Sequence, residues 1–374
     1  MTLLPEIAHS GERTTVSYAR LHAFTARLFA EHGIPDHRAH LAAEALCHGD
    51  LCGFDSHGLF NLTRLYLPLL RSGRVDPTAE PTTRIDLGAC AVLDARRALG
   101  LWAAAEAVDA AAHRALEHGV GLVPVRGGTH FGCAGFHAAR AAERGLVGIV
   151  ASNCGSQRIA RPPLGALAML GTNPISVAAP ALEGHPFVLD MSTTTVPTGK
   201  VRVAASDGER VPPGWLADDT GNPVTDPAAV DRGEAHLRWL GGEPATGAHK
   251  GFGLGLVVEV LSALLSGAGV GPAPAALDGD GGPHGRDDDI GYFVLVLAPD
   301  LLRPGGAFAA DARSLFGTLL DCPAAAGEPV RYPGWHEAER AARRRRDGVP
   351  LRASVHRELV ELGLDESDVD GGAR

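Results

Sequence analysis

Helical patterns at both ends of the chain enclose a middle of short apolar runs, and this arrangement limits the fold more than any single motif. Near the N-terminus, apolar residues recur at helical spacing, namely Leu21, Phe24, Leu28 and Phe29. Gly33 ends this helix, Pro35 follows it, and a second helix is expected over 36–52. The chain becomes helical again from about Glu337. We therefore expect the two termini to pack together into one helical unit.

The middle of the chain alternates short apolar runs with helices. Strand-like runs are expected at 82–93, 120–125, 147–151, 186–190 and 292–297. Further helices are expected at 62–70, 102–118, 135–144 and 251–265. The segment 267–290 is rich in Gly, Pro and Asp, which is typical of a loop. Strands and helices mixed in this way predict an α/β fold.

Composition excludes several classes of protein. The 374 residues are 45% apolar and 21% charged, which is enough apolar material for two or three structural units. The formal net charge of −10 argues against nucleic-acid binding. No apolar run reaches the roughly 20 residues of a membrane span. Six cysteines without a CxxC pair indicate a reduced, cytoplasmic chain and no metal cluster.

One local exception to the acidic balance is the arginine run 343–346, which lies in a helical pattern beside Glu337, Glu339 and Asp347. Such a run on a helix is usually a solvated face, and a polyanion site is the less common alternative. We interpret it as a solvated face.

Neither standard nucleotide-binding motif is complete. The nearest to a Rossmann fingerprint is 251–255, where the third glycine falls one residue early and no strand precedes the segment. The segment 198–201 lacks the upstream glycine and the Ser or Thr of a P-loop. A nucleotide cofactor, if one is used, therefore requires another kind of binding domain.

Three residues on expected loops have side chains suited to chemistry: His57, His130 and Lys250. Histidine changes its charge near neutral pH and so suits proton transfer to a carbonyl oxygen. For any one of the 17 histidines, however, a surface or structural role is the more common interpretation. Spacing alone does not choose between these alternatives.

An ordered set of short segments carries a family resemblance. The segments are 53–58, 129–132 with Gly135, 152–153, 170–174, 189–194 with 199–200, and 249–251. With these segments the chain resembles the malate/L-lactate dehydrogenase family of the sulfolactate-dehydrogenase-like type, which includes ureidoglycolate dehydrogenase, diketogulonate reductase and Δ1-piperideine-2-carboxylate reductase. The resemblance spans roughly residues 15–365.

The resemblance implies an α/β fold with a mixed sheet, a cofactor domain that is not Rossmann-like, and a homodimer with the active site in a cleft between domains. It divides the chain into a helical N-terminal part, 1–75, packing with 310–374, a central and dimerisation part, 76–126 with 270–309, and a nicotinamide-cofactor domain, 127–269. A non-Rossmann domain accounts for the missing glycine fingerprint.

The resemblance also assigns catalytic roles. His57 matches the proton donor and acceptor, Ser56 hydrogen-bonds substrate or histidine, and His130 is a second active-site histidine. Asp190 is expected to orient His57 and stabilise its imidazolium, because an aspartate partner raises a histidine pKa. Two simpler alternatives stay open: Ser56 capping the following helix, and Asp190 acting as a turn residue at a strand end.

The cofactor contacts implied by the resemblance are Asp190, Met191, Ser192, Thr193, Thr194 and Lys250, with weaker contacts at Gly291 and Tyr292. The lysine ammonium suits phosphate or ribose oxygens. Asn173 and Pro174 are interpreted as a supporting turn. The sequence does not separate NAD from NADP.

The family pattern breaks just after His57. Its members usually carry an arginine four residues on, which grips the substrate carboxylate, and a tyrosine four residues later; here these positions are Asn61 and Leu65. Asn61 is expected to hydrogen-bond a neutral group of the substrate instead. Arg64 is nearby but offset, and a long side chain there is an alternative carboxylate ligand. Without the bidentate clamp, we expect a substrate less dependent on a carboxylate than malate or lactate.

The sequence therefore predicts an NAD(P)H-dependent oxidoreductase that transfers hydride to or from a C=O group of a small molecule, such as a 2-oxo or 2-hydroxy acid or a related ketone. The alternative within the same fold is a cyclic imine reductase of the Δ1-piperideine- or pyrroline-carboxylate type. A catalytically silent homologue that serves as a binding protein is a third hypothesis. No metal is expected, because no cluster has metal-ligand spacing.

Overall fold

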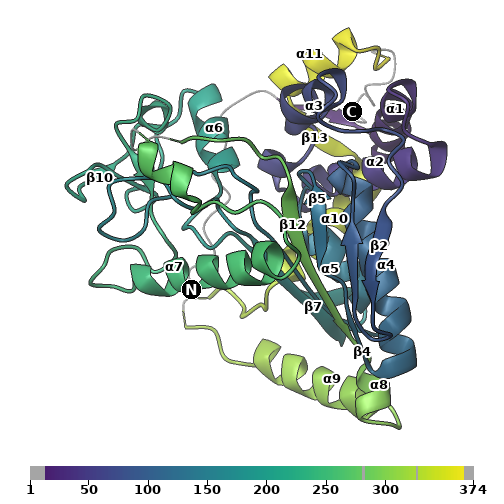
Figure 1. Cartoon of the computed structure of the whole chain (residues 1–374). Helices are drawn as coiled ribbons and strands as arrows, with labels where there is room; N and C mark the ends of the chain where they lie inside the picture. The colour runs from purple at the N-terminus through teal and green to yellow at the C-terminus, as the bar shows by residue number, and fades with distance from the viewer. Residues whose placement is uncertain (1–12, 280–282, 326, 366–374) are drawn as a thin grey trace, which may run out of the picture.

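The computed structural model describes residues 13–279, 283–325 and 327–365 and is shown in Figure 1. Its main sheet consists of β2 (Thr82–Asp86), β3 (Ala91–Asp94), β4 (Val120–Leu122), β5 (Val125–Gly128), β6 (Val147–Ser152), β7 (Ile175–Leu182), β8 (His185–Met191) and β12 (Ile290–Leu297). The strand order is β2-β3-β5-β12-β6-β7-β8, with β4 paired to β12 off this path. β3 and β5 pair parallel and the other pairs antiparallel, so the predicted mixed sheet is confirmed.

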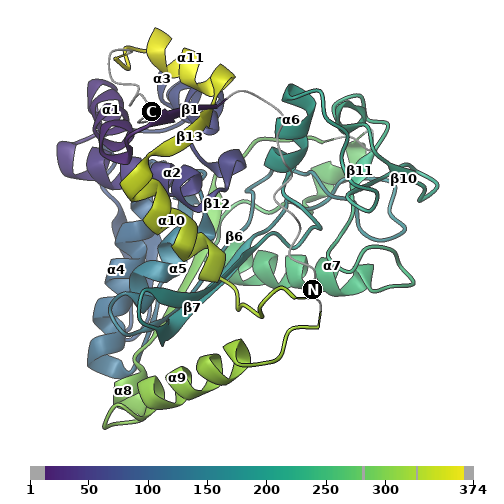
Figure 2. The same cartoon turned by 180° about the vertical axis from the view of Figure 1, so that it is seen from behind.

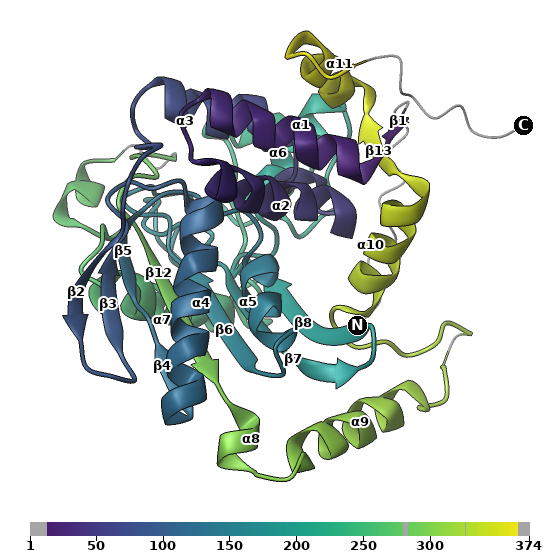
Figure 3. The same ribbon diagram turned by 90° about the vertical axis from the view of Figure 1, so that its right-hand side faces the viewer.

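Helices cover both faces of this sheet, namely α4 (Gly100–His118), α5 (Ala134–Ala142), α7 (Ala248–Val258) and the π-helix η4 (Glu259–Leu264). Successive residues of a strand point to opposite faces. Tyr292 and Val294 belong to the large core with α4 and α5, whereas Phe293 packs with Val258 on the α7–η4 side. The central strand is thus buried on both faces (Figure 3).

The first and last described elements of the chain lie side by side (Figure 2). This terminal unit contains β1 (Arg13–Val16), α1 (Tyr18–Glu31), α2 (Asp36–Cys52), α3 (Leu67–Arg71), α10 (Trp335–Asp347), β13 (Val349–Arg352) and α11 (Ala353–Glu361). β1 pairs antiparallel with β13, and α10 packs on α2. Part of the predicted C-terminal segment lies elsewhere, because α9 (Ala307–Leu320) packs on β7. The short helix α8 (Pro299–Leu302) leads into α9.

A small lobe lies beside the main sheet. It contains α6 (Thr198–Ser206), β9 (Leu216–Ala217), β10 (Pro223–Val224), the 3-10 helix η3 (Pro227–Ala229) and β11 (His236–Leu237). Its strands pair in the order β10-β9-β11 around a separate apolar core that includes Trp215 and Leu237. The predicted loop 267–290 holds the 3-10 turn η5 (Pro274–Asp278). Among the described helices, none is both long and apolar enough to cross a membrane.

Candidate active site

The segment that carries His57 is fastened where α2 ends. Gly53 takes the left-handed conformation (φ 85°) that commonly terminates a helix. The last carbonyls of α2 are capped from α10: Arg340 Nη1 donates to Cys52 O at 2.7 Å, and Arg344 Nη1 donates to Asp50 O. Arg344 is only 7% exposed, so the predicted solvated arginine face is wrong at this position. Arg344 instead anchors the helix before the His57 segment, whereas Arg343, Arg345 and Arg346 are exposed as predicted.

The 3-10 helix η1 (Asp55–His57) is also held by both terminal strands. The Asp55 carboxylate accepts from Arg13 Nη2 at 3.1 Å and from Arg352 Nε at 3.3 Å. Arg352 in turn pairs with Asp207 at the end of α6. The β1–β13 pair therefore links the His57 segment to the small lobe.

The structure brings His57 and His130 face to face. Their ring centroids lie 6.1 Å apart with 27° between the planes. His57 Nδ1 lies 2.9 Å from Ser56 Oγ, and His130 Nδ1 lies 2.8 Å from Tyr66 Oη. The backbone N–H of Gly132 also donates to His130 Nδ1, at 3.3 Å. Because both Nδ1 atoms are engaged by protein, both Nε2 atoms are left for a ligand.

Both histidines are neutral at neutral pH. Burial lowers the pKa of His57 to about 3, with His130 and Lys200 adding to the effect. Burial also lowers the pKa of His130, and the Asp287 carboxylate opposes that shift. A neutral imidazole is the form that accepts a proton.

Tyr66 is a site residue that the sequence did not assign. It ends the π-helix η2 (Leu62–Tyr66), and its side chain is fully buried. The family pattern places a tyrosine one residue earlier, at Leu65. A π-helix closes i→i+5 rather than i→i+4 hydrogen bonds, which accommodates a one-residue offset, and π-helices are frequent at functional sites. The offset lets the Tyr66 hydroxyl reach His130.

Lys200 is a second site residue to whose side chain the sequence assigned no role. Gly199, at the start of α6, packs so closely on the His57 segment that a Cβ there would lie 2.9 Å from Ser56 Cβ. The next residue, Lys200, contributes positive charge at His57. Its side chain reaches solvent, yet its surroundings bury it enough to lower its pKa, an effect that Glu337 opposes.

Asp190 does not contact His57 in the described structure. Its carboxylate accepts from the Gly135 backbone N–H at 2.7 Å, at the start of α5. A Cβ at Gly135 would lie 2.9 Å from Asp190 Oδ2, so only glycine permits this approach. Burial raises the pKa of Asp190 to about 6. The ring partner that the structure gives His57 is Ser56 rather than the expected Asp190.

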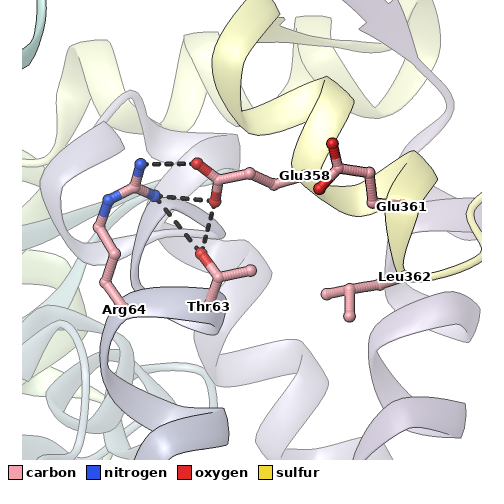
Figure 4. Close-up of a pocket in the computed structure, with 5 residues that line it drawn as sticks. All are labelled: Thr63, Arg64, Glu358, Glu361 and Leu362. Carbon is pink, nitrogen blue, oxygen red and sulfur yellow. Dashed lines mark hydrogen bonds and ion pairs between the residues drawn. The ribbon is translucent and has the colours of Figure 1, made fainter.

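In the described structure, Asn61 and Arg64 both have partners within the protein. The Asn61 side-chain amide donates to Ser56 O at 2.9 Å and so supports the His57 segment. Arg64 donates to the Glu358 carboxylate at 2.7 and 3.0 Å, and its guanidinium lies 4.1 Å from the Phe60 ring centroid. Figure 4 shows Arg64 and Thr63 both directed at Glu358 of α11. This ion pair engages the arginine that is the alternative to the missing clamp.

In the predicted cofactor loop after β8, the side-chain hydroxyls donate to backbone carbonyls. Ser192 Oγ donates to Thr194 O, Thr193 Oγ1 to Thr172 O, and Thr194 Oγ1 to Val196 O, at 2.8–3.0 Å. The loop therefore has backbone groups and the partly exposed Met191 to offer a ligand.

The start of α7 lies against this loop. A Cβ at Gly251 would lie 2.7 Å from Thr193 O, so glycine is required there. Lys250 is exposed in the first turn of α7, where unpaired N–H groups also favour anions. An exposed ammonium beside a glycine-lined loop fits a phosphate-bearing cofactor.

Gly291 and Tyr292, predicted to contact the cofactor, are instead buried against other parts of the protein. Tyr292 is 0% exposed, stacks on Phe131 at 5.1 Å, and its hydroxyl donates to Thr129 O. The Gly291 N–H donates to Asn153 Oδ1 at 2.9 Å in a buried setting. A fully buried tyrosine cannot touch a cofactor; it supports the loop that carries His130.

Comparison with known proteins decides the family, because residues 16–360 match the malate/L-lactate dehydrogenase pattern. The chain belongs to the malate/L-lactate dehydrogenase family. It is 35% identical to a (2R)-3-sulfolactate dehydrogenase (NADP(+)) of Chromohalobacter salexigens, over 89% of this chain and 91% of that protein.

Two solved structures of the family resemble the fold. Malate dehydrogenase from Entamoeba histolytica has a TM-score of 0.85 and 27% identity, covering 94% of this chain and 97% of that one. Δ1-Piperideine-2-carboxylate reductase from Pseudomonas syringae pvar. tomato has a TM-score of 0.78 and 29% identity, covering 93% and 99%.

Membership of the malate/L-lactate dehydrogenase family confirms the predicted fold and the oxidoreductase class, since the relatives are named dehydrogenases and reductases. The predicted nicotinamide cofactor agrees with a relative named for NADP(+). Across the described ranges, no group of three or more His, Cys, Asp or Glu side chains is arranged to hold a metal ion.

Proposed function

We propose that this protein is an NAD(P)H-dependent oxidoreductase that interconverts a C=O group and the corresponding alcohol on a small molecule, with His57 as proton donor and acceptor. The observation that carries this proposal is the facing pair His57 and His130, 6.1 Å apart, each with Nδ1 engaged and Nε2 left for substrate.

The two rings suit different tasks. The Gly132 N–H donates to His130 Nδ1, which requires that nitrogen to be unprotonated and places the proton on Nε2. His130 then donates a hydrogen bond to the substrate oxygen, while His57 Nε2 takes the hydroxyl proton during oxidation and returns it during reduction. The bound cofactor supplies or accepts the hydride.

The pKa of His57 fits this role. A pKa of about 3 keeps His57 neutral and ready to accept a proton in alcohol oxidation. In the reducing direction, negative charge from a bound anionic substrate raises this pKa and favours the protonated form. Ser56 remains on Nδ1 in both directions and fixes the ring orientation.

For the cofactor, we propose that the loop Asp190 to Thr194 and Lys250 bind NAD or NADP. Support comes from the close packing of Gly251 on Thr193 and from the exposed Lys250 ammonium. Phosphate oxygens would pair with Lys250 and with the free N–H groups of the first turn of α7.

A cyclic imine reductase is the second candidate. It is favoured by the structural similarity to a Δ1-piperideine-2-carboxylate reductase. The same His57 proton would then be delivered to an imine nitrogen instead of an oxygen.

The proposed assembly is a homodimer, with the cytoplasm as the proposed location. The α7–η4 helix exposes an apolar stripe at helical spacing, namely Leu256, Val260 and Leu264, which are 38–64% exposed. The six cysteines are free, as is usual in a reducing compartment. Light scattering on the wild type and on Val260→Glu tests the dimer, which the substitution is expected to dissociate.

A substrate panel with NADH and NADPH, followed by nicotinamide absorbance, tests the function. It contains 2-oxo acids, neutral ketones and cyclic imine carboxylates. Turnover of at least one ketone or imine supports the proposal, and the preferred class separates the two candidates. Lack of NADH and NADPH binding in a fluorescence titration would instead favour a silent binding protein.

A further inference from the structure

The chain contains only two lysines, Lys200 and Lys250. The other 32 of its 34 Lys and Arg residues are arginines. A chain that uses arginine almost everywhere retains lysine at two positions that both border the proposed active site. Lysine offers a compact point charge on a flexible stem, whereas arginine offers a rigid fork, so the two are not interchangeable. Lys250 is accounted for by the cofactor, but Lys200 is not.

Lys200 is placed beside the histidines by the close contact of α6 with η1. The contact is possible because residue 199 is glycine, whose Cα approaches Ser56 where a Cβ would lie 3.0 Å from Ser56 O. Ser56 Oγ holds His57 Nδ1 at 2.9 Å. Lys200 therefore follows directly after Gly199, the residue that packs on Ser56, and Ser56 in turn positions His57.

Three arginines near the His57 segment are already engaged by carboxylates. Arg64 is held by Glu358 at 2.7 Å and lies over the Phe60 ring. Arg13 and Arg352 are paired with Asp55. By contrast, Lys200 makes no ion pair within 4.0 Å among the residues that the structure describes, and Glu337 acts on it only at longer range.

The Lys200 side chain is exposed, so an anion from solvent can reach its ammonium and pair with it. Its positive charge also disfavours protonation of His57, which has to carry a proton in the reducing direction. A substrate anion between the two groups pairs with the ammonium and offsets its effect on His57.

We propose that Lys200 binds the carboxylate of an anionic substrate, adjacent to the carbon that exchanges hydride. This inference rests on the proposed function and narrows its substrate class to 2-oxo or 2-hydroxy acids and cyclic imine carboxylates. The charge lost at position 61 is thus supplied from α6, as a single point charge in place of a fork.

Oxalate, a dianion shaped like a 2-oxo acid, is the probe for the first test. Calorimetric titration of the enzyme–NADH complex is compared for wild type, Lys200→Met and Lys200→Arg, with the exposed Arg346→Met as control. We expect about 10- to 100-fold weaker oxalate binding in Lys200→Met, partial retention in Lys200→Arg and unchanged NADH affinity. Equal oxalate affinity in wild type and Lys200→Met, or loss in Arg64→Met instead, overturns the proposal.

Because the chain has only two lysines, the Lys200 ammonium can be observed directly by NMR. Reductive methylation with 13C-formaldehyde keeps the charge and labels Lys200, Lys250 and the terminal amine, and Lys200→Arg identifies the Lys200 signal. Oxalate is expected to raise the pKa of Lys200, whereas NADH alone shifts the Lys250 signal. A Lys200 signal that responds to NADH but not to oxalate overturns the inference. Failure of NADH to bind overturns the proposed function instead, and oxalate can still be titrated without it.

Discussion

The Tyr66 hydroxyl lies 2.8 Å from His130 Nδ1, and it gets there from the last residue of a π-helix. With the Gly132 N–H on the same nitrogen, Tyr66 holds the His130 ring, whose centroid lies 6.1 Å from that of His57. A buried tyrosine thus positions one histidine of the pair, while Ser56 positions the other.

Tyr66→Phe removes this hydrogen bond with little change in packing. We expect kcat to fall about fivefold, because one hydrogen bond of about 1 kcal/mol no longer orients His130. The thermal midpoint should change little, since the apolar ring is kept. Steady-state kinetics on Tyr66→Phe, with Tyr332→Phe as control, test this; Tyr332 donates to His185 O, on another strand end. Equal effects of the two variants on kcat would contradict the positioning role.

Arg344 is expected to matter far more for stability than its neighbours in the arginine run. It is buried and caps Asp50 O at the end of α2, so Arg344→Ala should cost about 2–3 kcal/mol of unfolding free energy. Arg346 is exposed and pairs with the adjacent Asp347, so Arg346→Ala should leave stability unchanged. Urea unfolding of both variants measures the difference, and equal midpoints would refute the capping role.

The Arg64–Glu358 ion pair is expected to fasten α11 without serving the substrate. Both side chains are about a third exposed, so a double-mutant cycle should give a coupling of about 0.5–1 kcal/mol. Oxalate affinity should be the same in Arg64→Ala and wild type. A large loss of oxalate affinity in Arg64→Ala would return the carboxylate contact to Arg64.

His137 should make stability fall at acid pH. Burial lowers its folded pKa from 6.5 to about 3, the Phe131 carbonyl opposes the shift, and Arg140 and His48 add to it. The unfolded chain therefore takes up the proton first, and stability is lost as the pH falls from 6.5 towards 3. The contribution is at most about 1.4 kcal/mol per pH unit.

His137→Gln removes this one titration. Its unfolding free energy should depend less steeply on pH than that of wild type within the same window. Asp50 and Asp190, whose pKa values burial raises to about 7 and about 6, act in the opposite direction and are present in both proteins. Parallel pH profiles of the two proteins would show that His137 does not titrate as described.

Local elements were predictable where the chain carries its own stop signals. The helix expected over 36–52 is α2, Asp36–Cys52, because Pro35 precedes it and Gly53 ends it in the left-handed region. β7, Ile175–Leu182, was missed because its half-buried pattern, interrupted by Pro180, lacks clear alternation. The β1–β13 pairing joins residues more than 330 positions apart, which no local pattern encodes.

The candidate site divides in the same way. His57 and His130 were found through short local motifs, and the structure places them together. The roles of Asn61, Arg64 and Tyr292 depended on which distant group each side chain meets, and those partners are Ser56, Glu358 and Thr129. The scarcity of lysine was visible in the sequence and would have pointed to Lys200.

The central claim is that His57 carries the proton in an NAD(P)H-dependent reaction. Single-turnover reduction of the best substrate by His57→Ala, with NADH affinity measured on the same protein, tests it most directly. The account predicts unchanged NADH affinity and a rate lowered by about 10²- to 10⁴-fold. A rate within twofold of wild type would contradict it.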